Sequence, residues 1–426
     1  MAGDQFQISQ LAVPAVSVLI CFLAYTSQYF FLHFEPAPLQ VDEVWRINIF
    51  ALCIWVCYYR TCFVDPGRLP SDKKHEDLNA EKDHARGRRQ RWCRRCEAYK
   101  PPRAHHCKTC KRCIPKMDHH CPWTANCVSH FTFPHFMRFL FYAVVGMSYL
   151  EKRLFKRVAI VWDSRDLPSY LGPSVGQLIH LFILFVLNSV TVFGLFVLLL
   201  RVVYSLSLNT TTIESWEIER HATLVRRARA LGGYLDGPGG MKVRIMHQEF
   251  PYDIGILTNI KEGMGGSWNI IGWFWPFAAT PDRRTGWEFE ENGFENAGVS
   301  WPPPDPDRIP MPDLDTLNYN IATYASAREE VDAFHRRQEA DFSRRRPFSQ
   351  IQKRQKFHER YQGEHHKVED GDEPVYGDSD EGEEGWRNSE GENLGNYGVD
   401  IEAEFYDEDE DDVPLAVLIN RRKQNQ

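Results

Sequence analysis

Three long apolar runs dominate the first half of the chain. Residues 11–34 contain no Asp, Glu, Lys or Arg, and at about 1.5 Å per residue a helix of this length exceeds the roughly 30 Å hydrocarbon core of a bilayer. Residues 47–64 carry one arginine near their end, where a long side chain reaches the interface. Residues 178–200 are uncharged, and their two polar interruptions, His180 and Asn188, are expected to face other helices. Each run predicts a membrane-spanning helix.

A fourth apolar run, residues 136–150, is weaker because it is short, contains Arg138 and is followed by five charged residues. Taken alone it is equally consistent with a buried helix or a re-entrant segment. Charge favours a span: residues 65–135 hold 16 Lys plus Arg against 8 Asp plus Glu. The stretch that follows Arg201 is basic as well, with Arg220, Arg226, Arg227, Arg229, Lys242 and Arg244. The positive-inside rule places both segments in the cytoplasm, which requires a second span between them. Residues 151–174 would then lie on the other side although they are also slightly basic.

The pattern therefore predicts an α-helical integral membrane protein with four transmembrane helices and both termini in the cytoplasm. The net charge of -8 conceals an uneven distribution, since residues 369–412 hold 20 acidic residues and one basic residue. Such a block buries too little apolar surface to fold, and we expect a disordered acidic C-terminal tail. We find no internal repeat. The expected division is transmembrane helices 1 and 2 (11–64), a cytoplasmic cysteine-rich domain (65–135), transmembrane helices 3 and 4 (136–200), a second cytoplasmic region (201–295), and a Pro-rich linker with the acidic tail (296–426).

Seven of the eleven cysteines are concentrated in 35 residues between the second and third predicted spans. Disulfides are disfavoured there because thiols on the cytoplasmic side are kept reduced. Two Cys-x2-Cys pairs together with further Cys and His residues supply enough ligands for two closed tetrahedral zinc sites. The alternative is a set of reactive thiols without metal. The seven are Cys93, Cys96, Cys107, Cys110, Cys113, Cys121 and Cys127.

Two Cys3His sites use six cysteines, so one cysteine remains. If residues 118–121 are extended, His119 and Cys121 share one face and His120 points the other way, free to bind zinc. His119 and Cys121 then face each other as base and thiol, and Asp118 can accept a hydrogen bond from the second nitrogen of His119. This is the orienter, base and nucleophile arrangement of covalent catalysis. The alternative is that these three residues only pack a zinc module.

The tetrapeptide Asp118-His119-His120-Cys121 resembles the signature of the DHHC-type protein S-acyltransferases, or palmitoyltransferases. The resemblance covers about residues 10–280. The order of spans and tail, with Cys127-Val128-Ser129-His130-Phe131, looks most like the fungal members of the endoplasmic reticulum. Ser129 departs from the family, in which many members have Gly. Further family-like features are Asp65-Pro66-Gly67, Lys100-Pro101-Pro102-Arg103, residues 120–127, a TTxE motif at Thr211-Thr212-Ile213-Glu214, and an aromatic motif with Asn259, Gly265 and residues 273–276.

This resemblance implies a multi-pass enzyme of the endoplasmic reticulum membrane with two Zn²⁺ ions. Cys121 would be acylated from acyl-CoA (palmitoyl-CoA), with His119 as base and Asp118 as its polariser, and the acyl group would pass to a cysteine of a substrate protein. The implied zinc ligands are Cys93, Cys96, His106 and Cys113 for one ion, and Cys107, Cys110, His120 and Cys127 for the other.

The expected partners are the membrane, acyl-CoA and substrate proteins with cytoplasmic cysteines, chiefly membrane proteins. Basic residues of 86–95 with Arg103, Lys108, Lys111 and Arg112 are candidates for the CoA phosphates, or else for topology and anionic lipid. Nucleic acid is not expected, because the module lies between two spans and too near the bilayer to wrap a duplex. The rival interpretation is a non-catalytic, zinc-dependent membrane scaffold.

Overall fold

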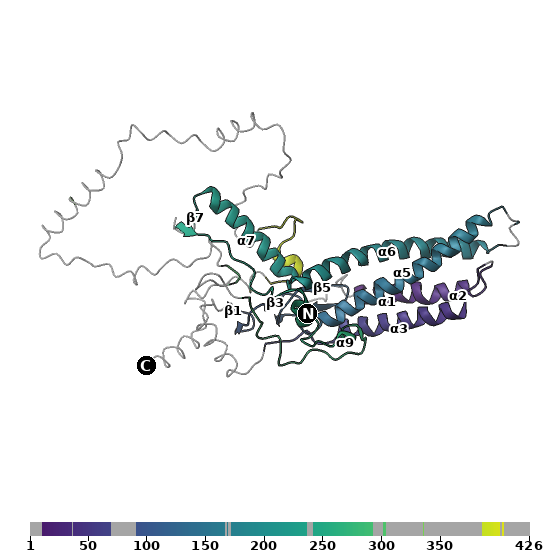
Figure 1. Cartoon of the computed structure of the whole chain (residues 1–426), viewed down its shortest axis with the longest axis horizontal. Helices are drawn as coiled ribbons and strands as arrows, with labels where there is room; N and C mark the ends of the chain where they lie inside the picture. Colours follow the sequence, from purple (N-terminus) through teal and green to yellow (C-terminus); the bar gives the residue numbers. More distant parts are fainter. Residues whose placement is uncertain are drawn as a thin grey trace, which may run out of the picture. The chain divides into compact units, whose positions relative to one another are not determined.

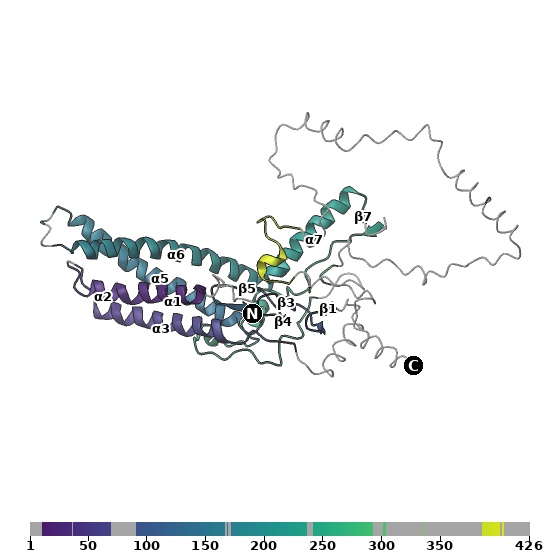
Figure 2. The ribbon, with the colours of Figure 1, turned by 180° about the vertical axis from the view of Figure 1, so that it is seen from behind.

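The computed structural model of the chain describes residues 11–69 except 36, and residues 91–166, 168, 172–236, 242–292, 301–303, 335, 386–400 and 403. Four long helical segments lie side by side (Figures 1 and 2). The first consists of α1 (Ala12–Cys21), the π-helical turn η2 (Phe22–Thr26) and α2 (Ser27–Phe31). The others are α3 (Val41–Phe63), α5 (Phe133–Asp163) and α6 (Val175–Ser207).

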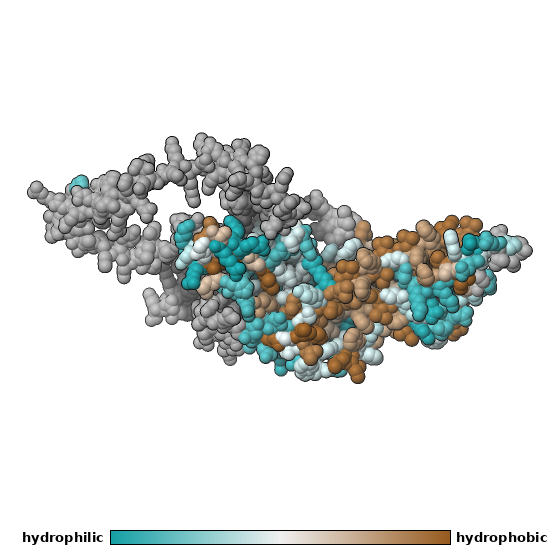
Figure 3. Space-filling view, turned by 45° about the horizontal axis from the view of Figure 1, so that its top comes forward, coloured by the Kyte–Doolittle hydropathy of each residue, from teal (hydrophilic) through white to brown (hydrophobic). Residues whose placement is uncertain are grey.

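Two of these helical segments are long and apolar enough to cross a membrane, namely Ala12–Phe31 and Val175–Ser207. Helices α3 and α5 are of similar length but carry more charge. Large apolar side chains of α6 such as Phe182, Val190 and Phe193 point outward, each about two-thirds exposed. Figure 3 shows apolar residues gathered over the middle of the bundle and hydrophilic ones toward both of its ends. Such an apolar outer surface is typical of a membrane-associated bundle.

Three charged side chains at the far end of α3 and α5 contact each other between the helices. Glu43 of α3 lies 2.7 Å from Nη2 of Arg157 and 3.0 Å from Nη1 of Arg153, both of α5. The side chain of Asn188 on α6 donates to Glu151 at 2.6 Å, so this polar residue faces a neighbouring helix as predicted. Pairing of this kind allows charged side chains to be buried between helices.

Three short β-hairpins lie between α3 and α5 at one end of the bundle. They are β1 (Arg91–Cys93) with β2 (Ala98–Lys100), β3 (His105–Cys107) with β4 (Arg112–Ile114), and β5 (His119–Cys121) with β6 (Asn126–Val128). The third hairpin is fixed to α3, because the amide of Asn126 donates to the carbonyl oxygens of Thr61 and Val64. The departure at Ser129 is accommodated: its hydroxyl is buried and donates to the carbonyl of Pro66 at 2.7 Å.

After α6 the chain passes back over the hairpins and the adjacent end of the bundle. Helix α7 (Thr212–Ala230) begins with a capping box formed by Thr211 and Glu214. It is followed by β7 (Tyr234–Asp236) paired with β8 (Lys242–Arg244), then α8 (Ile256–Gly263) and α9 (Ile270–Phe274). Helix α9 is held against the bundle by Arg138 of α5, which donates to the carbonyl oxygens of Trp273 and Gly272.

The prediction that residues 369–412 are unfolded is wrong for residues 386–400. These residues include the 3-10 helix η7 (Leu394–Tyr397) and pack against the hairpins and α7. The average composition of the acidic block conceals a short apolar group. Leu394, Tyr397 and Val399 within it supply the buried apolar surface that allows these residues to fold. The remainder of the predicted tail, except Ala403, and most of the Pro-rich linker lie outside the described residues.

Candidate metal centres and active site

The three hairpins are copies of one 14-residue unit, so the expectation of no internal repeat is wrong. Strands β1, β3 and β5 begin at residues 91, 105 and 119, and β2, β4 and β6 begin at 98, 112 and 126. The turns repeat as well, because Glu97, Lys111 and Ala125 adopt positive φ angles of 50°, 54° and 50°. The repeat is difficult to see in the sequence because Thr124 stands in the third copy where the first two copies have a cysteine.

Strand register brings the zinc-ligand candidates together. His106 is paired with Cys113 across the second hairpin, and His120 with Cys127 across the third. Directly opposite residues of an antiparallel pair project to the same face. Each of these His-Cys pairs therefore meets the Cys-x2-Cys turn of the preceding hairpin.

Two groups of four result, each with its ligand atoms within 4.8 Å of one another: Cys93, Cys96, His106 and Cys113, and Cys107, Cys110, His120 and Cys127. In the first, Nδ1 of His106 lies 3.3, 3.3 and 3.7 Å from the three sulfurs. In the second, Nδ1 of His120 lies 3.6, 3.5 and 3.5 Å from them. A tetrahedral Zn²⁺ with ordinary Zn–S and Zn–N bonds requires N-to-S edges of about 3.6 Å. Both groups fit such an ion, with the ligand division that the sequence resemblance implied.

The third hairpin repeats the metal-binding turn but has no following hairpin to complete a cluster. Cys121 occupies the position of Cys93 and Cys107, and Thr124 stands where the first two copies have Cys96 and Cys110. The positions where a fourth copy would supply His and Cys fall in α5 and hold Pro134 and Phe141. Cys121 is thus a zinc-knuckle cysteine placed outside both clusters.

Asp118, His119 and Cys121 lie in contact. Nδ1 of His119 is 2.6 Å from Oδ2 of Asp118, and the His119 ring lies close enough to the Cys121 thiol for each group to shift the pKa of the other. The backbone N–H and the hydroxyl of Thr212 donate to the two oxygens of Asp118 at 2.7 and 2.9 Å. The first turn of α7 therefore fixes the carboxylate, which in turn orients the imidazole.

The electrostatics of this arrangement favour charge on all three groups. Burial raises the pKa of Asp118, but hydrogen bonds from His119 and Thr212 outweigh burial and hold that pKa below its ordinary value. Burial lowers the pKa of His119, yet hydrogen bonds to Asp118 and Cys121 outweigh it and raise that pKa to about 10. Burial raises the pKa of Cys121, but His119 and Thr124 lower it by a larger amount. The pKa of Cys121 therefore lies below its ordinary value.

The Cys121 thiol faces the helix bundle. It is 6% exposed and packs in one apolar cluster with Val128, Phe136 and Leu140, to which Leu195 of α6 is added. An apolar cavity, partly open to its surroundings, lies between α1, α3, α5 and α6, and Leu195 lines it too. A thiol beside an apolar cavity suits a reactant with a long hydrocarbon chain.

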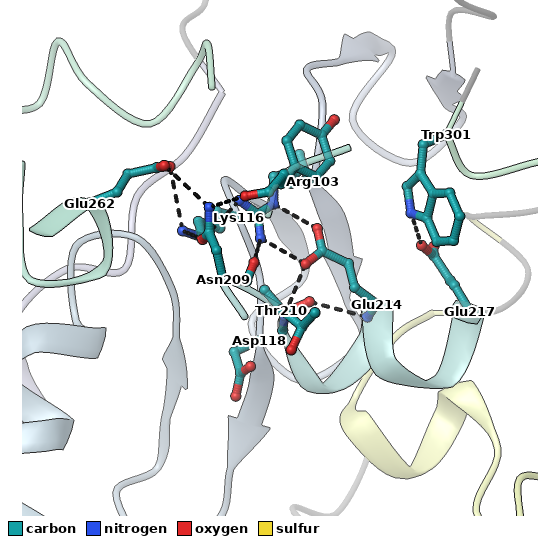
Figure 4. A network of polar contacts seen from close by, with 12 residues as sticks. Arg103, Lys116, Asp118, Asn209, Thr210, Glu214, Glu217, Glu262 and Trp301 are labelled. Atoms are coloured by element: carbon teal, nitrogen blue, oxygen red, sulfur yellow. Dashed lines mark hydrogen bonds and ion pairs between the residues drawn. The ribbon is translucent and has the colours of Figure 1, made fainter. Parts of the chain in front are cut away.

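A buried polar network connects the hairpins to α7 (Figure 4). Arg103 donates to both carboxylate oxygens of Glu214 at 2.6 and 2.7 Å, and Lys116 donates to Asn209 at 2.8 Å. Arg103 is therefore buried and ion-paired, which corrects its assignment as a candidate for CoA phosphates. Two other candidates face carboxylates, since Arg112 pairs with Asp65 at 2.6 Å and Arg95 with Asp400 at 2.6 Å.

A helix bundle carrying two Cys3His clusters and an adjacent Asp-His-Cys arrangement has close known counterparts. The family model described as "DHHC palmitoyltransferase" matches residues 87–219. The chain is 63% identical to palmitoyltransferase pfa4 of Emericella nidulans over 100% of its own length and 99% of the relative. Identity is 63% to palmitoyltransferase pfa4 of Aspergillus fumigatus, with 100% of both chains covered.

A more distant relative is palmitoyltransferase PFA4 of Saccharomyces cerevisiae, 33% identical over 68% of this chain and 76% of that one. The chain therefore belongs to the DHHC palmitoyltransferase family. It is accordingly a DHHC-type protein S-acyltransferase.

Proposed function

We propose that this protein transfers a long acyl group from acyl-CoA to cysteine thiols of other proteins through an acyl thioester on Cys121. The observation that carries the proposal is the position of His119, which is hydrogen-bonded to Asp118 and lies beside the Cys121 thiol. The palmitoyltransferase names of the relatives support palmitoyl as the acyl group.

The reaction proceeds in two balanced steps. In the first, His119 takes the proton of the Cys121 thiol, the sulfur attacks the carbonyl carbon of the acyl-CoA thioester, and the CoA thiol leaves with that proton. In the second, His119 takes the proton of a substrate cysteine, whose sulfur attacks the acyl-Cys121 carbonyl and releases the Cys121 thiol. Asp118 keeps His119 in one tautomer and stabilises its protonated form.

The acyl chain is proposed to occupy the apolar cavity. Along α5 the cavity extends from Phe139, near Cys121, to Leu150, which at about 1.5 Å per residue is a length of about 16 Å. The lining is almost entirely aliphatic and aromatic, as desolvation of a hydrocarbon chain requires. A thiol near one end of an apolar cavity favours a long chain over a short one.

Two Zn²⁺ ions are proposed to hold the three hairpins together. Cys93, Cys96, His106 and Cys113 would bind one ion, and Cys107, Cys110, His120 and Cys127 the other. When bound, the ions supply folding free energy to strands that are only three residues long. Because His120 is a ligand, the second ion also fixes the strand that carries His119 and Cys121.

All four long helical segments are proposed to cross the membrane, with both termini on the cytoplasmic side. Part of the charge that makes α3 and α5 less apolar is internal, as the pairing of Glu43 with Arg153 and Arg157 indicates. The basic hairpin region favours the cytoplasmic side. The endoplasmic reticulum is the proposed membrane. Cytoplasmic cysteines of membrane proteins are the proposed acceptors, because Cys121 lies next to the bundle.

An alkyne-tagged palmitoyl-CoA assay on purified protein tests the proposal. The unchanged protein should acquire a hydroxylamine-labile acyl group and Cys121→Ser should not. His119→Ala should keep about two zinc ions per chain yet lose labelling, whereas Cys93→Ser should lose metal. The scaffold interpretation expects no labelling of the unchanged protein and normal partner recruitment by His119→Ala.

A further inference from the structure

A segment near the C-terminus contributes to the core of the zinc domain. We define the docking segment as residues 386–400 together with Ala403. Its Leu394, Tyr397 and Val399 are 4%, 6% and 1% exposed and share one apolar cluster with residues of the hairpins and of α7, among them Cys107, Ile114, Met117, Cys127, Ile213 and Trp216. Apolar burial of this extent holds the segment against the domain rather than leaving it in solvent.

Main-chain hydrogen bonds add the docking segment to the edge of the second hairpin. Val399 forms an antiparallel bridge with Cys107. The backbone N–H of Lys108 donates to the carbonyl of Gly398, and that of Asp400 donates to the carbonyl of His106, both at 2.9 Å. The segment thus uses β-augmentation, the mode by which extended peptides bind exposed strand edges.

Gly398 brings the docking segment into close contact with a zinc-ligand candidate. Its φ of 82° lies in the left-handed region, and a Cβ at this position would meet Cβ of His120 at 2.6 Å. A side chain larger than hydrogen therefore does not fit. Since His120 lies between His119 and Cys121, the segment supports the catalytic strand from its zinc-facing side.

The docking segment also contacts α7, the helix whose first turn holds Asp118. The indole N–H of Trp216 donates to the carbonyl of Glu392 at 3.2 Å, and its ring packs edge-on against Trp386 at 4.9 Å. The backbone N–H of Ser389 donates to Glu219 at 2.7 Å. The segment therefore bridges the two elements that position Asp118 and His119.

We propose that the docking segment is an intramolecular brace that completes the zinc domain and keeps its catalytic strand and α7 in place. The docking itself does not depend on the proposed function, whereas the effect on acylation rests on it. A brace is favoured over an inhibitory strap, because the segment covers the His120 face of β5 while Cys121 packs on the opposite side against α5.

Limited cleavage of the full chain tests the docking. A protease site is inserted after residue 350, and the cleaved protein is passed over a size-exclusion column in detergent. The fragment carrying residues 351–426 should stay bound to the rest. The combined Tyr397→Ala and Val399→Asp substitutions should weaken retention on the order of a hundredfold, while Tyr397→Phe, which keeps the buried ring, should retain it. Separation of the unchanged fragment as readily as the doubly substituted one overturns the proposal.

Autoacylation of the uncleaved double variant tests the brace. We expect a rate about tenfold lower, with rescue in Tyr397→Phe, because strand β5 and α7 lose a shared support. A fall in the zinc content of the double variant would show that the segment acts through His120. An unchanged zinc content would show that it acts through α7. Release of the segment with an equal or higher acylation rate would contradict the brace and identify an inhibitory strap. An absence of acylation in the unchanged protein would instead count against the proposed function.

Discussion

Arg103 and Glu214 form a buried ion pair in which the guanidinium nitrogens Nε and Nη2 lie 2.6 and 2.7 Å from the two carboxylate oxygens. The pair joins the segment before β3 to the first turn of α7, whose Thr212 holds Asp118. Side-chain exposure is 1% for Arg103 and 3% for Glu214, so solvent screening is small. The orientation of the Asp118 carboxylate thus depends on the Arg103–Glu214 pair, because Glu214 lies two residues after Thr212 in α7.

The pair predicts an acid-dependent loss of stability. Burial raises the pKa of Glu214, but Arg103, with a smaller contribution from Lys116, holds that pKa below its ordinary value. A carboxylate whose folded-state pKa is depressed contributes stability above its unfolded pKa of about 4.3, and the contribution is lost as pH falls through the folded-state pKa. We therefore expect the difference in thermal midpoint between the unchanged protein and Arg103→Met/Glu214→Gln to be constant above about pH 5 and to change below it.

Both proteins in this comparison contain the same zinc ligands, so protonation of the thiolates affects them equally. Glutamine retains the capping role of residue 214. Lys116 faces Glu262 as well as the pair, and Lys116→Met in both backgrounds separates its contribution. A midpoint difference that is the same at pH 7 and pH 4 would rule out the pair as the source of acid sensitivity.

Thr212→Val is expected to slow autoacylation about tenfold while leaving zinc content unchanged. The substitution removes the hydroxyl that donates to Asp118 at 2.9 Å and keeps the backbone N–H. A hydrogen bond to a charged group contributes about 1.5 kcal/mol or more, equivalent to roughly tenfold in rate. Thr223→Val is the matched control on the same helix, since its hydroxyl bonds only locally to the carbonyl of Glu219. Equal autoacylation rates in Thr212→Val and Thr223→Val would show that the Thr212 hydroxyl does not support catalysis through Asp118.

Ala143→Leu is expected to shift the preferred acyl-CoA toward shorter chains. Ala143 lines the apolar cavity on α5 and is 3% exposed, so added methyl groups must occupy cavity space. Val145→Leu is the control, because that side chain is 36% exposed on the same helix. Competition between acyl-CoA esters of different length, read as the chain carried by the protein, measures the shift. An unchanged preference in Ala143→Leu would place the acyl chain elsewhere.

Glu43→Gln is expected to destabilise the helix bundle by about 3–5 kcal/mol, because Arg157 is left buried without a counter-charge. Arg157 is 4% exposed and 2.7 Å from Glu43. Asp42→Asn is the neighbouring control, since its pair with Arg46 is exposed on both sides and should contribute less than about 1 kcal/mol. Thermal unfolding in detergent compares the two. Equal midpoints would mean that the charges of α5 are compensated by other groups.

The sequence predicted the long helices and the zinc-ligand candidates because both depend on local patterns. Runs of apolar residues determine where α1, α3 and α6 lie, and Cys-x2-Cys spacing with the alternation at His119, His120 and Cys121 separates ligands from the remaining thiol. The helices extend further than the apolar runs, most of all α5 (Phe133–Asp163). Its second half contains several charged residues, and two of them, Arg153 and Arg157, are compensated by Glu43, which lies more than 100 residues earlier in the chain.

Long-range pairing explains what the sequence did not predict. Arg103 looked like a free cation until Glu214 was found beside it, and the docking segment looked unfolded because its acidic composition outweighed Leu394, Tyr397 and Val399. A signal for the hairpin repeat was present, since Cys93, Cys107 and Cys121 are spaced 14 residues apart. It was missed because Thr124 replaces the cysteine of the third copy.

The most direct test of the account is to locate the acyl group by mass spectrometry of the purified protein after incubation with palmitoyl-CoA. The tryptic peptide of residues 117–138 contains Cys121 and Cys127, so fragmentation is needed to distinguish them. The account predicts a hydroxylamine-labile acyl group on Cys121 and none on Cys127. An acyl group found instead on Cys127, or on a free thiol of α3 such as Cys57 or Cys62, with Cys121 unmodified, would contradict it.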